Sequence, residues 1–185
     1  MKSRGFFKSL ELKYIAVAIL PLLAMFYTQI ANSVILAFGE QVLLATIPVD
    51  PRDILRGDYV TLNYEISFID EAMLTGVPDR EIFVTLQKDE IGIGTVKSVS
   101  AARPPDGLYL RGVIRDRRGG IAYGIGVYYV PEGTGLEIEN KISGMDETQI
   151  LVDARVLRGR PVIKNLVEFR GTTLEPVRPG ESPTD

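Results

Sequence analysis

The residues of this chain whose types and spacing come closest to a chemical site are carboxylates. Asp50, Asp53 and Asp58 lie within nine residues of one another, and Glu132 stands in a second polar turn further along the chain. Carboxylate oxygens at this spacing can ligate calcium, and two that converge can act as general acid and base. The three aspartates can instead accept hydrogen bonds from turn amides and pair with the arginines between them. We favour this second interpretation and predict no metal site.

Histidine and cysteine are both absent from the 185 residues. Their absence excludes a Ser-His-Asp triad, a thiol nucleophile and a zinc-thiolate centre, and no residue pattern indicates a cofactor. An enzyme is therefore the less favoured interpretation. If the protein is one, the sequence leaves a hydrolase or glycan-acting enzyme in which Asp58 and Glu132 share a concave pocket as a carboxylate pair.

A tyrosine-rich stretch is the other candidate site. Tyr128, together with Tyr59, could line an aromatic groove that binds a peptide or a small molecule. Tyrosines in strands more often pack against cross-strand neighbours, which is the alternative. The residues that we single out for binding are Asp58, Tyr59, Tyr128 and Glu132.

These residues must be positioned by the segments around them, and the most clearly patterned segment is 57–68. A turn rich in proline and aspartate precedes it, and Gly57 permits a backbone conformation that other residues resist. From Tyr59 onward the side chains alternate in polarity, which is typical of a half-buried strand. The face that we expect to be buried carries Val60, Leu62, Tyr64, Ile66 and Phe68.

The entrance to this strand also carries a resemblance. Residues 57–64 read Gly-Asp-Tyr-Val-Thr-Leu-Asn-Tyr, with Gly57, Asp58, Tyr59, Leu62 and Tyr64 as landmarks. This stretch resembles the signature of the GDYXXLXY family of bacterial membrane-anchored proteins, and the turn at 48–53 and the segment 128–133 are also similar to that family. The resemblance runs to about Phe169 and implies a single membrane span with an extracytoplasmic domain, often accompanied by a multi-spanning membrane protein. It implies no activity.

The N-terminal part of the chain predicts a membrane anchor. Residues 14–39 carry no formal charge, and as a helix they would span roughly 39 Å, more than the roughly 30 Å hydrocarbon core. A cleaved signal peptide is the alternative, but the apolar run is long and no small-x-small site ends it. We expect the helix to cross the inner membrane once. Because residues 1–13 are basic, we expect them in the cytoplasm and the domain after the helix in the periplasm or outside the cell.

The remainder of the chain predicts an all-β fold. Eight segments with strand patterns, at intervals near ten residues, favour an antiparallel sandwich or barrel over residues 40–170. They are 40–47, 59–68, 81–88, 94–102, 107–114, 121–130, 149–157 and 161–169. We expect a helical turn at 71–74, one short helix at 136–142, and a flexible tail over 171–185.

Charge indicates which partners to expect. When residues 1–13 are set aside, the chain carries 17 basic and 23 acidic residues, a net charge of −6. An acidic domain argues against a nucleic-acid partner, because phosphate binding depends on Lys and Arg. The lipid bilayer and another integral membrane protein are the partners that we expect. The sequence therefore predicts an anchored interaction or scaffold module, with a carboxylate enzyme and a peptide or small-molecule binder as alternatives.

Overall fold

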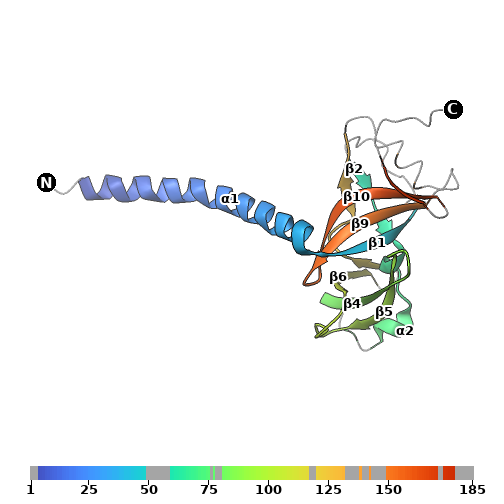
Figure 1. The fold of residues 1–185 in the computed structure, drawn as a ribbon. Coiled ribbons are helices and arrows are strands. Elements are labelled where there is room, and N and C mark those ends of the chain that lie inside the picture. The colour runs from blue at the N-terminus through green and yellow to red at the C-terminus, as the bar shows by residue number, and fades with distance from the viewer. Residues whose placement is uncertain are drawn as a thin grey trace.

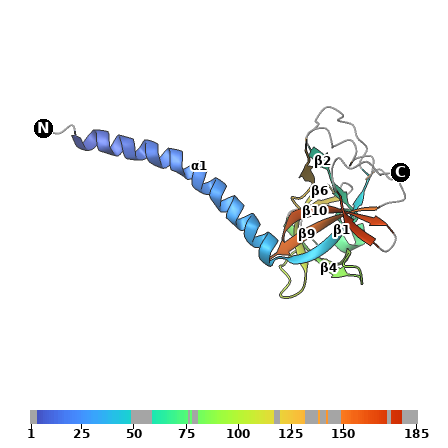
Figure 2. The ribbon, with the colours of Figure 1, turned by 45° about the horizontal axis from the view of Figure 1, so that its top comes forward.

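A long helix leads directly into a β domain (Figure 1). The computed structural model describes residues 4–48, 59–75, 77, 81–116, 120–131, 138, 142, 149–170 and 173–177. Helix α1 covers Arg4–Phe38, so it begins inside the segment predicted to precede the anchor. Its part Val17–Phe38 is long and apolar enough to cross a membrane, with a mean hydropathy of 1.7 and little contact with the rest of the protein. In both views α1 projects away from the β domain (Figures 1 and 2).

The β domain contains two larger antiparallel sheets and one strand pair. The order is β11-β10-β9-β1-β3 in the five-stranded sheet and β5-β4-β6-β7 in the four-stranded sheet, and β2 pairs with β8. The strands are β1 Glu40–Ile47, β2 Tyr59–Thr61, β3 Asn63–Tyr64, β4 Glu81–Lys88, β5 Gly94–Ser100, β6 Tyr109–Asp116, β7 Gly120–Ala122, β8 Val127–Tyr129, β9 Gln149–Leu157, β10 Arg160–Arg170 and β11 Thr173–Pro176. The all-β prediction is confirmed, with short helical segments η1 Glu65–Ser67 and α2 Glu71–Leu74.

The core lies between the two larger sheets, which Figure 1 shows one above the other. Alternation along the strands explains it: Val42 and Leu44 of β1 point inward and are fully buried, while Leu43 between them packs on the outer face with Leu151. The sheets are joined at the loop between β4 and β5, where the Leu43 amide donates to the Gly92 carbonyl at 2.9 Å. One face of β1 therefore belongs to the main core, and the other packs in a second, smaller hydrophobic cluster.

The strand predicted over 59–68 is divided in the structure. Val60, Leu62 and Tyr64 are buried as expected, but the backbone turns through η1 after Tyr64. The turn interrupts the two-residue period, and Phe68, expected in the core, is 51% exposed. A similar division splits the predicted strand 121–130 into β7 and β8. These two divisions and the additional strand β11 give the described residues eleven strands instead of eight.

Two further expectations differ at the C-terminal side. Residues 173–176 fall in the predicted flexible tail, yet they form β11, whose pairs with β10 include Phe169 opposite Leu174. Its four side chains are all exposed, so an edge strand of this kind leaves no burial pattern in the sequence. Of the helix predicted at 136–142 the structure describes only Ile138 and Ile142, which are helical and buried in the core.

Candidate functional site

The junction between α1 and β1 is one residue long. Gly39 alone separates them, and it is buried against β9. A side-chain carbon there would collide with the Ile35 carbonyl oxygen and with the backbone nitrogen of Val156. On the same face of the helix Ala31 and Asn32 are half-buried and Ile35 is buried, which is the spacing of a helix stripe packed on a neighbour. The last two turns of α1 therefore rest on the domain.

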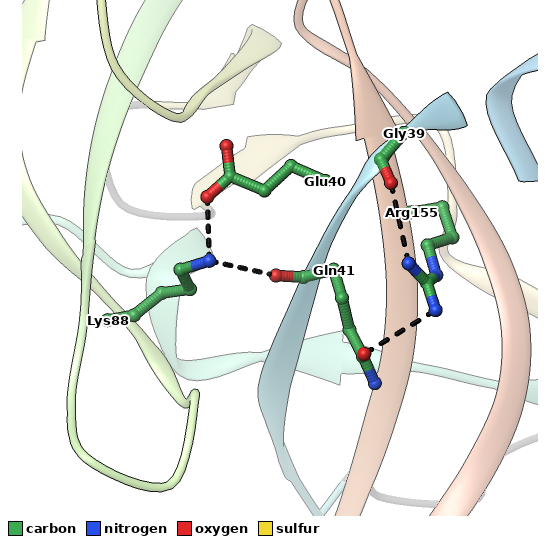
Figure 3. A network of polar contacts seen from close by, with 5 residues as sticks. All are labelled: Gly39, Glu40, Gln41, Lys88 and Arg155. Carbon is green, nitrogen blue, oxygen red and sulfur yellow. Dashed lines mark hydrogen bonds and ion pairs between the residues drawn. The ribbon is translucent and has the colours of Figure 1, made fainter. Parts of the chain in front are cut away.

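Polar contacts hold this junction from both sides (Figure 3). The Lys88 ammonium donates to the Glu40 carboxylate at 2.6 Å and to the Gln41 carbonyl at 3.3 Å. On the other side the Arg155 guanidinium donates to the Gly39 carbonyl at 3.5 Å and to the Gln41 side chain at 3.4 Å. The three exposed contacts are individually weak, and the Arg155 bond to Gly39 is long and only partly buried, but together the four contacts tie the first residues of β1 to β4 and β9.

The strand pair β2–β8 brings together the two segments that the sequence singles out. Tyr59 lies opposite Tyr129, and Val60 lies opposite Tyr128. The Tyr59 and Tyr129 rings meet edge to face with centroids 6.3 Å apart, a geometry that aromatic pairs prefer. Tyr59 and Tyr128 are thus neighbours in one ladder, although they do not pair directly.

Next to this ladder two tyrosines, one in β3 and one between β7 and β8, form a reciprocal pair of hydrogen bonds, which we call the clasp. The Tyr64 hydroxyl donates to the Ile125 carbonyl at 2.5 Å, and the Tyr123 hydroxyl donates to the Ile66 carbonyl at 2.7 Å. The Leu62 amide adds a bond to the Gly126 carbonyl at 2.9 Å. Burial raises the pKa of the Tyr64 and Tyr123 phenols well above their usual range, because the charged form is poorly solvated there. These phenols are structural donors and have no acid–base role near neutral pH.

A groove of about 480 Å³, which we call the helix groove, opens between α1 and the β8 and β10 strands. It is lined by Asn32, Gly124, Ile125, Val127, Tyr128, Tyr129, Arg160, Pro161, Val162 and Ile163. Tyr129 is the most exposed large residue of the domain's described part at 77%, and Val127 beside it is also exposed. Tyr128, predicted for binding, therefore lines a real concave surface, whereas Leu62 and Tyr64 of the signature are committed to the core.

A second groove, of about 500 Å³, lies on the outer face of the five-stranded sheet, and we call it the sheet groove. It is lined by Gln41, Leu43, Lys88, Asp89, Glu90, Ile91, Gly92, Asn165, Val167, Leu174 and Pro176. The Asp89 carboxylate shapes one wall, because it accepts hydrogen bonds from the amides of residues 91, 92 and 93. Ile91 and Leu174 leave apolar surface exposed at its rim.

Beside the sheet groove lies a buried acidic residue that sequence reasoning missed. Asp153 is 4% exposed and pairs in register with Leu43 on one side and Asn165 on the other. Its Oδ1 atom and the Asn165 Oδ1 atom are buried without a hydrogen-bond partner, and the Lys164 ammonium is 3.9 Å from Oδ2. Buried acceptors of this kind are costly unless a donor reaches them. The only sequence signal was a charged residue inside the apolar run Ile150–Val156.

Several sequence-predicted residues lie outside the described part of the chain. They are Asp50, Asp53, Gly57, Asp58 and Glu132. The structure therefore leaves both the carboxylate pair and the aspartate turn as predictions. Among the described residues there is no group of three or more acidic side chains placed to hold a metal ion.

Comparison with known proteins yields one match. The model of a family described as GDYXXLXY protein matches residues 21–166, from the apolar helix to β10. Neither the curated proteins nor the solved structures contain a match to this chain. The matched range includes the junction, the strand pair and both grooves.

Proposed function

The chain belongs to the GDYXXLXY protein family, and we propose that it is a single-pass inner-membrane protein whose β domain serves as an interaction or scaffold module for another integral membrane protein. In this proposal α1 is an uncleaved anchor, the N-terminus is cytoplasmic, and the domain lies in the periplasm or outside the cell. The basic residues before the apolar segment support that orientation.

The observation that carries the proposal is the one-residue junction. A tethered enzyme does not need a fixed orientation relative to the membrane, and a flexible linker would be sufficient for it. Here Gly39 admits no side chain, and Lys88 and Arg155 bind the first residues of β1. A domain held this way presents the same surface to a neighbouring membrane protein at all times, which lowers the entropy lost when they associate.

The sheet groove is the surface that we assign to the partner. Its lining begins at Gln41, three residues beyond the end of α1, so it lies within reach of loops that emerge from the same membrane. It combines exposed apolar side chains with polar ones, as the core and rim of protein interfaces do. The exposed carboxylates of Asp89 and Glu90 in its lining favour a partner segment that brings N–H or cationic donors.

Co-purification tests the partner surface. The full-length protein, tagged and extracted from its own cells in mild detergent, should retain a membrane protein. Ile91→Asp should remove that protein by placing a charge at the groove rim. Met73→Asp is the matched control, since Met73 on α2 is equally exposed at 46% but lies outside the groove. A parent chain recovered as a monodisperse monomer without any associated membrane protein contradicts the proposal.

A linker insertion tests the junction. Gly-Ser-Gly inserted between Gly39 and Glu40 should remove most of the retained partner while the far-ultraviolet spectrum of the domain is unchanged. The same insertion after Asp106, in the exposed loop between β5 and β6, should leave co-purification as in the parent. Equal retention of the partner by both insertion variants would show that the fixed orientation of the domain has no role in binding.

Orientation is tested by labelling, because the chain has no native cysteine. A membrane-impermeant maleimide should label the Lys97→Cys variant in cells with a permeabilised outer envelope and leave the Ser9→Cys variant unlabelled until the membrane is dissolved. Lys97 is exposed on β5. The reverse pattern places the domain in the cytoplasm. A domain recovered without its first forty residues identifies a cleaved signal.

The carboxylate enzyme is a second candidate function, and the pairing of β2 with β8 favours it. Asp58 directly precedes β2, and Glu132 follows β8 by three residues in the sequence. If the two converge, the purified protein should hydrolyse a dye-labelled cell-wall glycan or peptide, and both Asp58→Asn and Glu132→Gln should abolish the activity. Activity that survives in either variant excludes the pair.

A further inference from the structure

We propose that the helix groove is a binding site for the phosphate headgroup of an anionic phospholipid. The inference rests on the proposed membrane anchorage and adds a ligand that the partner model does not require. It follows from three independent features of the groove: its depth relative to the bilayer, an uncommitted cation, and its aromatic wall.

The depth of the groove follows from Asn32, the residue of α1 that lines it. Lys13 is the last charged residue before the apolar segment, and 19 residues separate it from Asn32. At about 1.5 Å per residue this distance is about 28 Å, close to the roughly 30 Å thickness of the hydrocarbon core. With Lys13 at the inner interface, the opposite headgroup region begins near Asn32, and the exposed apolar side chains of Val34, Leu36 and Phe38 continue the anchor into that region. The helix beyond it is packed on the domain and is not surrounded by lipid on that side.

The cation is Arg160, at the start of β10. Glu40, the second residue after α1, pairs with Val156, and because β1 and β9 are antiparallel the residues after Val156 run back beside the last turn of the helix. Arg160 is exposed, lines the groove, and makes no ion pair or side-chain hydrogen bond within the described ranges. Arg111, in contrast, is neutralised by Glu81 at 2.6 Å. A guanidinium presents a planar fork of donors that matches phosphate oxygens.

The aromatic wall is supplied by Tyr128 and Tyr129. Tyrosine is enriched where membrane proteins meet the headgroup region, because its ring is apolar and its hydroxyl is polar. Tyr129 and Val127 expose apolar surface that water solvates poorly. In the groove that surface would contact the glycerol and first acyl carbons of a lipid whose phosphate meets Arg160. A protein helix without an acidic side chain at this place would fill the apolar wall but would leave Arg160 without a counter-charge.

The test uses the absence of tryptophan from the chain. The Tyr129→Trp variant of the full-length protein carries one indole in the groove. The variant is reconstituted in nanodiscs of phosphatidylcholine. Each sample also contains a small fraction of a lipid brominated near the headgroup, either phosphatidylglycerol or phosphatidylcholine, and the quenching of the indole fluorescence by the two lipids is compared. We expect the anionic lipid to be preferred about fivefold, the ratio that corresponds to the roughly 1 kcal/mol attraction of one arginine to an anionic surface.

Arg160→Gln should abolish the preference, and Arg158→Gln is the matched control. Arg158 is an exposed arginine two residues away in the same turn, but it does not line the groove. Equal quenching by both lipids in the parent overturns the lipid site and leaves the groove to a protein helix. An equal loss in both arginine variants replaces the site with diffuse surface attraction. A chain that does not remain with the nanodiscs contradicts the anchor itself, and the discs hold no partner protein whose absence could be confused with either result.

Discussion

The segment 59–64 and the strand β8 beside it have an inner and an outer face, and the two faces differ in what they contact. On the inner face Leu62 and Tyr64 are about 2% exposed, and Tyr64 is bonded across to Ile125. On the outer face Tyr129 is 77% exposed and meets Tyr59 edge to face. The comparison separates signature residues that build the core from Tyr59, which instead contacts the groove residue Tyr129. The following changes should lower stability strongly on the inner face and only slightly on the outer face.

The largest effect is expected from Leu62→Ala on the inner face. Leu62 is a member of the main core, so truncation should lower the free energy of unfolding by about 2–5 kcal/mol through lost transfer energy and a cavity. The measurement is denaturant unfolding of the full chain in detergent, followed by far-ultraviolet circular dichroism. Thr61→Ala, one residue away but exposed, should cost less than about 0.5 kcal/mol. Similar losses in the two variants would contradict the division.

A pH titration should reveal the clasp on the same face. The Tyr64 and Tyr123 phenols have raised pKa values in the folded state, so their contribution to stability is complete below the unfolded value near 10 and is lost as the pH rises above it. Above about pH 10, each phenol should lower the free energy of unfolding by up to about 1.4 kcal/mol per pH unit. Tyr64→Phe combined with Tyr123→Phe should remove most of this slope. A slope that is unchanged in the double variant would mean that other groups cause the alkaline loss.

The inner face is also where the sequence predicts best. Alternation identifies Val60, Leu62 and Tyr64 as buried, because one half of a two-residue period must face the core. It fails at Phe68, where a helical turn shifts the phase, and that turn depends on tertiary contacts with Tyr123 that no local pattern records. For the same reason β11 was not predicted, since an exposed edge strand is stabilised by its partner's backbone and needs no apolar side chains.

The grooves were harder to predict than the strands. The sequence singles out Tyr128, which lines the helix groove, but it does not single out Asn32 or Arg160, because a groove between a helix and a distant strand is a product of topology. Asn32 and Arg160 are 128 positions apart in the sequence. Only the register of β1 with β9, which runs the turn after Val156 back along the helix, places them on one surface. Long-range register of this kind has no signature in a single strand.

The smallest effect on stability is expected on the outer face, from Tyr129→Ser. The edge-to-face contact with Tyr59 is a cross-strand pair on a solvated surface, so its loss should cost about 0.2–1 kcal/mol. The same unfolding experiment checks the value, with Leu62→Ala as the reference for a buried residue of the segment 59–64. A loss as large as that of Leu62→Ala would mean that Tyr129 is packed in the isolated protein. The groove would then be filled by the chain's own residues, and it would be free for neither a lipid nor a partner.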